Sequence, residues 1–257
     1  MSYINTYTPT KPVKPAYGPY GPDPYDINIA FPLIEETLET DRIKLTPFIP
    51  AKHAETFFAG IPDPEYFYRY LPFNMEKPED ALVFIDNSIR QNPYSVLFAI
   101  IDKTKPDDAH PDFGGTLAGG VAFLSHSPQN LVVEIGAVMI LPAFQRTHVT
   151  THVVGAMLRH SLEKPETSRP GLGLRRVNWC CHPGNAPSLK AAARMGFTYE
   201  GSMKWTWVLP EGKEGNLPGS DDISRGHGRD TTILSVTWET WQNGVRELID
   251  KALARTF

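Results

Sequence analysis

Hydrophobic and polar residues follow two periods along the chain, one typical of strands and the other of helices. Short apolar or alternating runs, bounded by turn-forming residues, predict strands at residues 38–48, 94–102, 116–126, 131–141, 175–182, 204–209 and 231–238. Apolar residues spaced three and four apart predict helices at residues 51–60, 64–71, 77–92, 147–163, 186–196 and 237–254. This order of elements indicates a mixed sheet flanked by helices.

The start of the chain differs from the rest. Residues 1–32 contain seven prolines and five tyrosines, and proline at this density cannot supply the hydrogen bonds of a helix or strand. We therefore expect a Pro/Tyr-rich N-terminal arm at residues 1–35 and a single domain at residues 36–257. The arm is either a disordered tail or an extended segment that lies on the domain or on a partner subunit, and a homodimer would supply that subunit.

Charge and cysteine content narrow the class of protein. The formal net charge of −4 argues against nucleic acid as a partner. No apolar run reaches the ~20 residues of a membrane span, and no secretory pattern begins the chain. The two cysteines, Cys180 and Cys181, are adjacent in a predicted strand and so point to opposite faces. We expect reduced thiols in a cytoplasmic protein, with no metal site and no membrane partner.

Four short motifs stand in a fixed order in the predicted domain. They are LETDRIKLTPF at 38–48, VEIGAVMILPAFQ at 133–145, NAPS with MGFTYEG at 185–201, and GRDTTILSVTWETW at 228–241. Together they resemble the GNAT acetyltransferase superfamily, in particular its RimJ/RimL branch of ribosomal-protein N-terminal acetyltransferases. The resemblance covers roughly residues 36–245. It implies an α/β (α+β) GNAT fold, in which a central mixed, twisted sheet contains a splayed strand pair and is flanked by helices.

The resemblance also implies acetyl-CoA as co-substrate and an amine as acceptor. In such proteins the pantetheine lies between the two splayed strands, which here would be residues 132–141 and 176–182. The family signature (Q/R)-x-x-G-x-(G/A) aligns on Gln145, His148 and Thr150, so both small-residue positions carry larger side chains. The amides of a helix N-terminus remain available whatever the side chains are, and Arg146 and His148 would add positive charge near the pyrophosphate. The alternative is a turn that has lost the cofactor.

The expected cofactor-binding residues follow from this alignment. They are Ile140, Leu141, Gln145, Arg146, Thr147, His148, Val149, Thr150, Thr151, Asn185 and Ser188.

Three residues are candidates for the chemistry. Glu134 would act as a base on the amine, directly or through water, or it is a salt-bridged glutamate. Ser188 would protonate the departing thiolate, as the resemblance implies, or it caps a helix. Asn185 would hydrogen-bond the pantetheine or a water, or it only starts the turn.

The acceptor side is expected to be aromatic. Tyr66, Tyr70 and Phe73 form either a core stripe or a pocket wall. Trp205 and Trp207 are two residues apart on a predicted strand and alternate with Lys204, Thr206 and Val208. Both would therefore share one face, toward the acceptor. Further along the chain, Asp230 is expected in a structural salt bridge. Lys190 and Arg194, four apart on one helix face, either meet the cofactor phosphates or form a solvated face.

These observations predict an acetyl-CoA-dependent N-acetyltransferase that acts on a primary amine, either a small molecule or a peptide N-terminus. The long polar loop at residues 210–230 would cover the acceptor cleft, which slightly favours a small enclosed substrate. The alternative is a non-catalytic GNAT-fold protein that binds acyl-CoA or serves as a scaffold.

Overall fold

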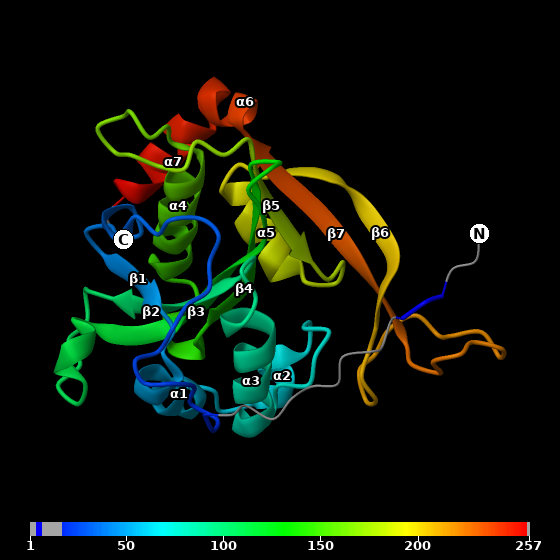
Figure 1. Cartoon of the computed structure of the whole chain (residues 1–257). Helices are drawn as coiled ribbons and strands as arrows, with labels where there is room; N and C mark the ends of the chain where they lie inside the picture. Colours follow the sequence, from blue (N-terminus) through cyan, green and yellow to red (C-terminus); the bar gives the residue numbers. More distant parts are fainter. Residues whose placement is uncertain (1–3, 7–16, 256–257) are drawn as a thin grey trace.

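The computed structural model describes residues 4–6 and 17–255 and contains one seven-stranded sheet. The strands lie in the order β1-β2-β3-β4-β5-β7-β6 (Figure 1). Their bounds are β1 Ile43–Pro47, β2 Val96–Asp102, β3 Thr116–Ser127, β4 Val132–Ile140, β5 Arg176–Cys181, β6 Thr198–Val208 and β7 Gly228–Thr237. The mixed α/β fold expected from the sequence is confirmed.

One junction in the sheet differs from all the others. Strands β4 and β5 are parallel, whereas every other neighbouring pair is antiparallel. Pairing between β4 and β5 is confined to Val132–Glu134 opposite Arg176–Asn178. Beyond this ladder, β4 continues to Ile140 and β5 to Cys181 without further pairing, so the two strands separate. The expected splayed pair is therefore present.

Helices pack around the sheet in two groups. The α-helices are α1 Pro50–Ala59, α2 Pro64–Tyr68, α3 Pro78–Phe84, α4 Val149–Leu162, α5 Ala186–Arg194, α6 Trp238–Thr240 and α7 Arg246–Leu253. The π-helices η2 Ile85–Arg90 and η5 Trp241–Val245 continue α3 and α6, and short 3₁₀ turns are η1 Glu35–Thr37, η3 Pro111–Phe113 and η4 Pro142–Phe144. In Figure 1, strands β1–β3 lie between α1 and α3 on one side and α4 with α7 on the other.

Several boundaries differ from the sequence expectation. Strand β6 begins at Thr198 instead of residue 204, because β7 pairs with it along this polar stretch. The single helix expected at residues 237–254 is broken at Gly244, whose φ of 130° lies outside helical geometry. Gly196, at φ 87°, follows the end of α5 as expected for a left-handed helix stop.

Part of the N-terminal arm lies on the domain. Phe31 is buried and its ring contacts that of His126, with 5.2 Å between centroids. Asp26 forms an ion pair with Arg90, and the amide of Ala30 donates to the carbonyl of Pro93. The expectations for residues 1–3 and 7–16 lie outside the described residues.

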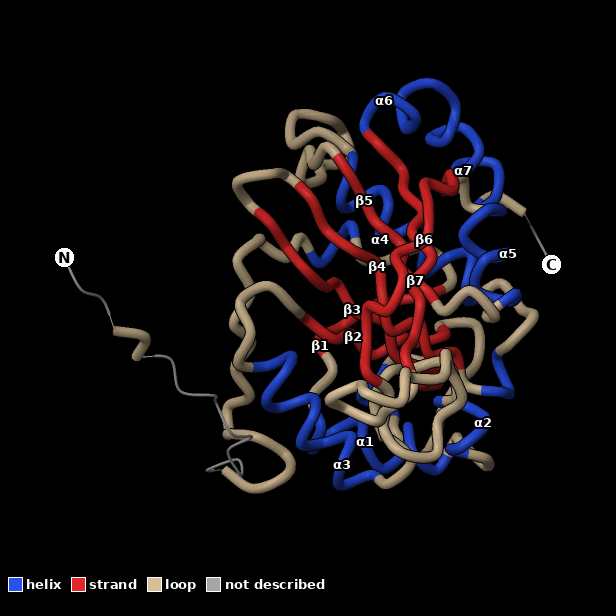
Figure 2. Tube along the Cα trace, turned by 90° about the vertical axis from the view of Figure 1, so that its right-hand side faces the viewer, coloured by secondary structure: helices blue, strands red, loops and turns tan. Residues whose placement is uncertain are grey.

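The loop between β6 and β7 reaches the α1–α3 end of the molecule (Figure 2). Lys213 in this loop donates to the carbonyl of Tyr68 and forms an ion pair with Glu76 at 3.3 Å. The loop is therefore fastened beside the segment that joins α2 to α3. No helix within the described part of the chain is long and apolar enough to cross a membrane.

Candidate active site

The gap between β4 and β5 forms one half of the candidate site. In β4 a bulge interrupts the pairing with β3 between Ala122 and Gly120, and Ala137 inside it has a φ of 47°. An extra residue in one strand locally bends and twists that strand. The edge of β4 beyond Glu134 thus faces the gap with no partner from β5. An extended ligand could pair with such an open edge as another strand would.

The turn from β4 to α4 lies at the mouth of this gap. The Thr147 hydroxyl donates to the carbonyl of Phe144 at 2.6 Å and accepts from the amide of Val149. No other described residue accepts a hydrogen bond from the amides of His148, Thr150 and Thr151. These unpaired donors at the positive end of a helix are the groups that suit phosphate.

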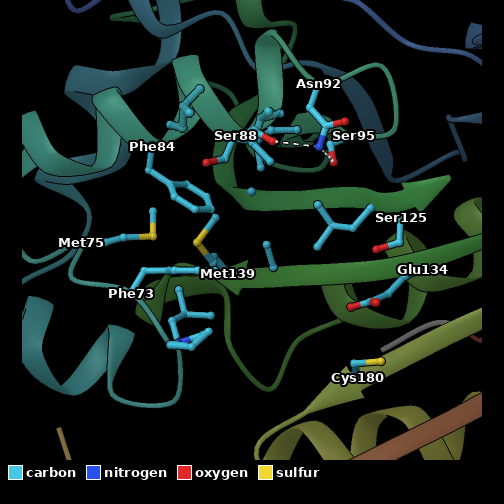
Figure 3. Close-up of a pocket in the computed structure, with 18 of the residues that line it drawn as sticks. Phe73, Met75, Phe84, Ser88, Asn92, Ser95, Ser125, Glu134, Met139 and Cys180 are labelled. Atoms are coloured by element: carbon cyan, nitrogen blue, oxygen red, sulfur yellow. Dashed lines mark hydrogen bonds between the residues drawn. The ribbon is translucent and has the colours of Figure 1, made fainter. Parts of the chain in front are cut away.

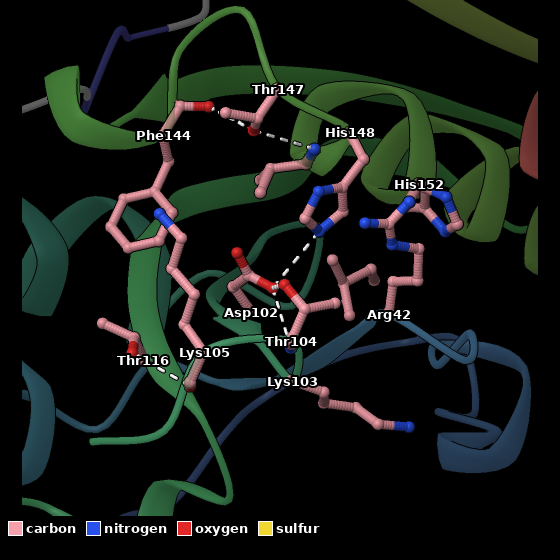
Figure 4. A network of polar contacts seen from close by, with 12 residues as sticks. Arg42, Asp102, Lys103, Thr104, Lys105, Thr116, Phe144, Thr147, His148 and His152 are labelled. Carbon is pink, nitrogen blue, oxygen red and sulfur yellow. Dashed lines mark hydrogen bonds and ion pairs between the residues drawn. The ribbon is translucent and has the colours of Figure 1, made fainter. Parts of the chain in front are cut away.

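The His148 side chain points away from the mouth of the turn. Its imidazole Nε2 lies 3.2 Å from an Asp102 carboxylate oxygen, and both side chains are buried (Figure 4). Thr104 donates to the same oxygen through its amide and its hydroxyl. The expectation that His148 adds positive charge at the pyrophosphate is therefore wrong. Its inward rotamer leaves the backbone accessible, and its φ of −65° shows that position 148 needs no glycine.

Other residues place positive charge at this turn. The Lys105 ammonium lies 4.5 Å from the ring centroid of Phe144, and Figure 4 shows the two side chains together. Arg146 is exposed and adopts a φ of 62°. Gln145 donates its side-chain amide to the carbonyl of Ile140 at 3.1 Å, which ties the turn to the end of β4. Leu141 is buried, and its amide donates to Ala118 in β3.

A pocket of about 840 Å³ forms the other half of the site. It lies between α3 and η2, strands β2–β4, and the ends of β5, β6 and β7. One end is apolar and holds Phe73, Met75, Phe84 and Met139, while Ser125, Glu134 and Cys180 lie at the other (Figure 3). Its remaining lining residues include Phe57, Phe58, Leu71, Ile85, Ser88, Asn92, Ser95, Leu124, His126, Ala137, Met203, Trp207, Arg229 and Thr231.

Glu134 lies where the gap meets the pocket. Burial raises the pKa of the Glu134 carboxyl, while a hydrogen bond with Cys180 and the charge of Arg229 oppose that rise. Burial and the neighbouring Glu134 raise the pKa of the Cys180 thiol to about 12, so this thiol stays protonated. Ile135 is fully buried in the core, as the alternation of a strand requires. A carboxylate with a raised pKa can accept a proton near neutral pH.

Asn185 and Ser188 meet at the start of α5. The Asn185 side chain caps the helix by accepting from the amide of Ser188 at 3.2 Å. The Ser188 hydroxyl accepts from the buried indole N–H of Trp179 at 2.9 Å. The cap is therefore Asn185, and the alternative that Ser188 caps the helix is wrong.

The expected acceptor residues are only partly brought together. Phe73 lines the pocket and meets Trp207 edge to face at 5.4 Å. Tyr66 is 62% exposed and lies under Arg69, and Tyr70 packs on His182, so neither lines the pocket.

Trp205 also lies outside the pocket. It has a φ of 53° at a register shift between β6 and β7, and its ring covers Gly228 where a Cβ would stand. The expectation that Trp205 and Trp207 share a face is wrong, because this irregularity breaks the alternation. Asp230 has the expected structural role, accepting from Lys204, Asn216 and the amide of Trp205.

Sequence reasoning missed several pocket residues. His126, Cys180 and Arg229 line the same pocket as Glu134 and come from three different strands. Of these three residues, only Arg229 lies in a recognisable sequence motif, the GRD at residues 228–230. Within the described residues, no group of three or more His, Cys, Asp or Glu side chains could hold a metal ion, and both cysteines are free thiols.

Comparison with known proteins agrees with this geometry. The sequence pattern of the acetyltransferase (GNAT) domain matches residues 42–198 of the chain. No curated protein is similar to the chain at a significant level.

Solved structures with the same fold include a GCN5-related N-acetyltransferase from Brucella melitensis, 24% identical with a TM-score of 0.64 over 84% of this chain and 85% of that one. RimJ from Mycobacterium smegmatis, solved with CoA-disulfide, is 14% identical with a TM-score of 0.59 over 82% and 88%. An acetyltransferase from Salmonella typhimurium, described as modifying the N-terminal serine of ribosomal protein L7/L12, is 17% identical with a TM-score of 0.55 over 77% and 96%. With its split sheet and the match over more than half of its length, the chain belongs to the GNAT acetyltransferase family.

Proposed function

We infer that the protein is an acetyl-CoA-dependent N-acetyltransferase that transfers an acetyl group to a primary amine. The observation that carries this proposal is the position of Glu134, at the point where the open edge of β4 meets a large apolar pocket. A carboxylate placed there would face both the acetyl end of a ligand in the gap and an amine in the pocket.

The chemistry assigned to each residue follows from its surroundings. Glu134 would take a proton from the ammonium form of the acceptor, because its raised pKa makes it a competent base. The amine nitrogen then bonds to the acetyl carbon while the bond from that carbon to sulfur breaks. A proton must reach the departing sulfur, and Ser188 at the start of α5 is our candidate donor.

The cofactor is assigned to the turn and the gap. The amides of His148, Thr150 and Thr151 would receive the pyrophosphate, and Arg146 and Lys105 would add positive charge. The backbone groups of β4 beyond Glu134 that face the gap would pair with the pantetheine, whereas the Leu141 amide is already bonded to Ala118 and the Ile140 carbonyl to Gln145. Acetyl-CoA supplies the activated acetyl group when it is bound.

The acceptor is either a small molecule or a peptide N-terminus. Structural relatives described as modifying a ribosomal protein support the peptide. The size of the pocket and the loop held by Lys213 support the small molecule.

Titration calorimetry with acetyl-CoA tests the proposal directly. We expect a micromolar Kd, equivalent to about −8 kcal/mol, and weaker binding with a smaller salt dependence in Arg146→Ala. A thiol-release assay with a panel of primary amines then measures transfer. Absence of binding at millimolar acetyl-CoA would refute the proposed function, and binding without any transfer would support a non-catalytic acyl-CoA-binding protein.

A further inference from the structure

Arg229 is a buried cation without a partner. Its residue is 7% exposed and lines the pocket from the start of β7. No hydrogen bond or ion pair joins its side chain to any other residue in the described part of the chain, and its Nε is shielded from solvent. A guanidinium stays protonated in proteins, so this site carries a full positive charge.

Such an arrangement is costly for a folded protein. A shielded guanidinium nitrogen that is neither paired nor hydrogen-bonded destabilises the native state. Elsewhere an arginine with a shielded side chain is paired: Arg90, whose side chain is 8% exposed, binds Asp86 at 2.6 Å and Asp26 at 2.7 Å. A partner for Arg229 is therefore expected from outside the chain.

The surroundings of Arg229 define what that partner must be. Arg229 lines the pocket together with Glu134 and Cys180, and its charge interacts with Cys181, Cys180 and Glu134, which places it near the polar end of the pocket. The charges of Arg229 and Glu134 interact, but no ion pair within 4.0 Å joins them, and the Arg229 side chain makes no hydrogen bond within the described residues. A ligand in this corner meets a carboxylate and a guanidinium together.

The other end of the pocket favours a ligand with a large apolar side chain. Phe73, Phe84, Met75 and Met139 gather at the other end (Figure 3). The nearby amide of Asn92 is already bonded to the Ser88 carbonyl and the Ser95 hydroxyl. A polar group buried among these four side chains would lose water without gaining a hydrogen-bond partner from them.

We propose that the acceptor is an α-amino acid with a large apolar side chain, whose carboxylate pairs with Arg229 while its amine faces Glu134. An α-amino acid carries these opposite charges on one carbon, as the corner requires, and its side chain would occupy the apolar end. This inference rests on the proposed acetyl transfer. Glu134 accepts the amine proton, the carbon–nitrogen bond forms, the carbon–sulfur bond breaks, and the thiolate takes up a proton.

Matched amines test the role of the carboxylate and of the side chain separately. Acetylation by the full-length protein is measured with L-phenylalanine, L-phenylalaninamide and L-alanine at saturating acetyl-CoA. We expect kcat/KM for L-phenylalanine to exceed the other two by about tenfold or more, since each comparison removes one recognised group. Phenylalaninamide has the more readily deprotonated amine, so a preference for the acid cannot come from intrinsic reactivity.

Variants connect that preference to Arg229. Arg229→Gln should lose the advantage of the acid over the amide, whereas Arg225→Gln, the same exchange at an exposed position four residues away, should keep it. Arg229→Lys retains the charge but not the bidentate fork, and should give an intermediate preference. If Arg229→Gln fails to fold, Arg229→Lys is used for the same comparison of acid and amide. Equal rates for acid and amide in the unmodified protein would overturn the proposal.

Calorimetry separates this inference from the proposed function. L-phenylalanine is titrated into the protein in the presence of CoA, which needs no catalysis. Binding that is lost in Arg229→Gln supports the proposal even if no acetyl transfer is detected. Acetylation of phenylalaninamide without measurable binding of L-phenylalanine would overturn it and leave the acetyltransferase intact.

Discussion

At the scale of single residues, Glu134 combines the proposed chemical role with a cost in stability. Burial raises the pKa of its carboxyl above the ordinary value of 4.5, so folding disfavours the ionised form. The associated stability is fully present below the unfolded pKa and is lost as pH rises through the folded pKa. A base at this position therefore gains proton affinity at the expense of the folded state near neutral pH.

Glu134→Gln should separate the two effects. The variant keeps the shape but cannot accept a proton, so turnover at neutral pH should fall by about 10²–10⁴ and partly recover as the amine loses its own proton at higher pH. In denaturant titrations it should be more stable than the parent at neutral pH, and the difference should shrink as pH falls toward 4.5. An unchanged pH–rate curve would remove Glu134 from the mechanism.

Ser188→Ala should affect both stability and rate if Ser188 is the proton donor. The substitution leaves the indole N–H of Trp179 without its acceptor, which should cost about 1–3 kcal/mol. Ser188→Thr keeps a hydroxyl and should restore both the melting temperature and the rate. A lower melting temperature with unchanged turnover would confine Ser188 to a structural role.

At the scale of elements, the N-terminus of α4 explains how a turn without glycine can still present donors to phosphate. Position 148 has ordinary backbone geometry, and its side chain leaves the surface to meet Asp102 in β2. The left-handed residue of the turn is Arg146, not either signature position. A phosphate-binding turn needs accessible backbone amides. The inward rotamer of His148 leaves those amides accessible, as a glycine at this position would.

Thr150→Pro tests those amides. Proline is tolerated in the first turn of a helix, and the Thr150 amide makes no hydrogen bond that the exchange would break. Loss of one charge-assisted donor should weaken acetyl-CoA binding by about tenfold or more. Thr150→Val, which keeps the amide and loses only the hydroxyl, is the matched control. Calorimetry on both gives the comparison, and equal weakening would assign the contribution to the hydroxyl.

At the scale of the whole molecule, four buried histidines set a limit on acid stability. Burial lowers the pKa of His53, His126, His152 and His160 to about 4. Each is therefore neutral in the folded protein where the unfolded chain would already be protonated. Their stability is present above the unfolded pKa near 6.5 and is lost as pH falls toward 4.

Unfolding measured across this window should show a steep pH dependence. Each histidine contributes up to ~1.4 kcal/mol per pH unit, because the unfolded state binds one more proton. His160→Gln should flatten the slope, because it removes one buried neutral ring. A flat stability between pH 6.5 and 5 would contradict burial of these neutral rings.

The sequence indicated the order of elements and the split between β4 and β5, because periodicity and four ordered motifs report on local structure and on family. Among the aromatic candidates it correctly indicated Phe73 as a residue of the pocket wall, but not Tyr66, Tyr70 or Trp205. Trp205 was misplaced because a register shift in β6 breaks the alternation on which the expectation depended. Arg229, His126 and Cys180 were missed because their common position arises only when distant strands assemble.

The split sheet also has a mechanical consequence. Strands β1–β4 and strands β5–β7 form two plates, and the backbone ladder between them consists of three residue pairs at one end. This three-pair ladder can act as a hinge. The two halves of the sheet can then open and close beyond Glu134 and Asn178 with little loss of backbone hydrogen bonds. A ligand in the wedge that bonds to both plates would act as a brace, stiffening the sheet and slowing hydrogen exchange of amides in β4 and β5 that lie far from any phosphate.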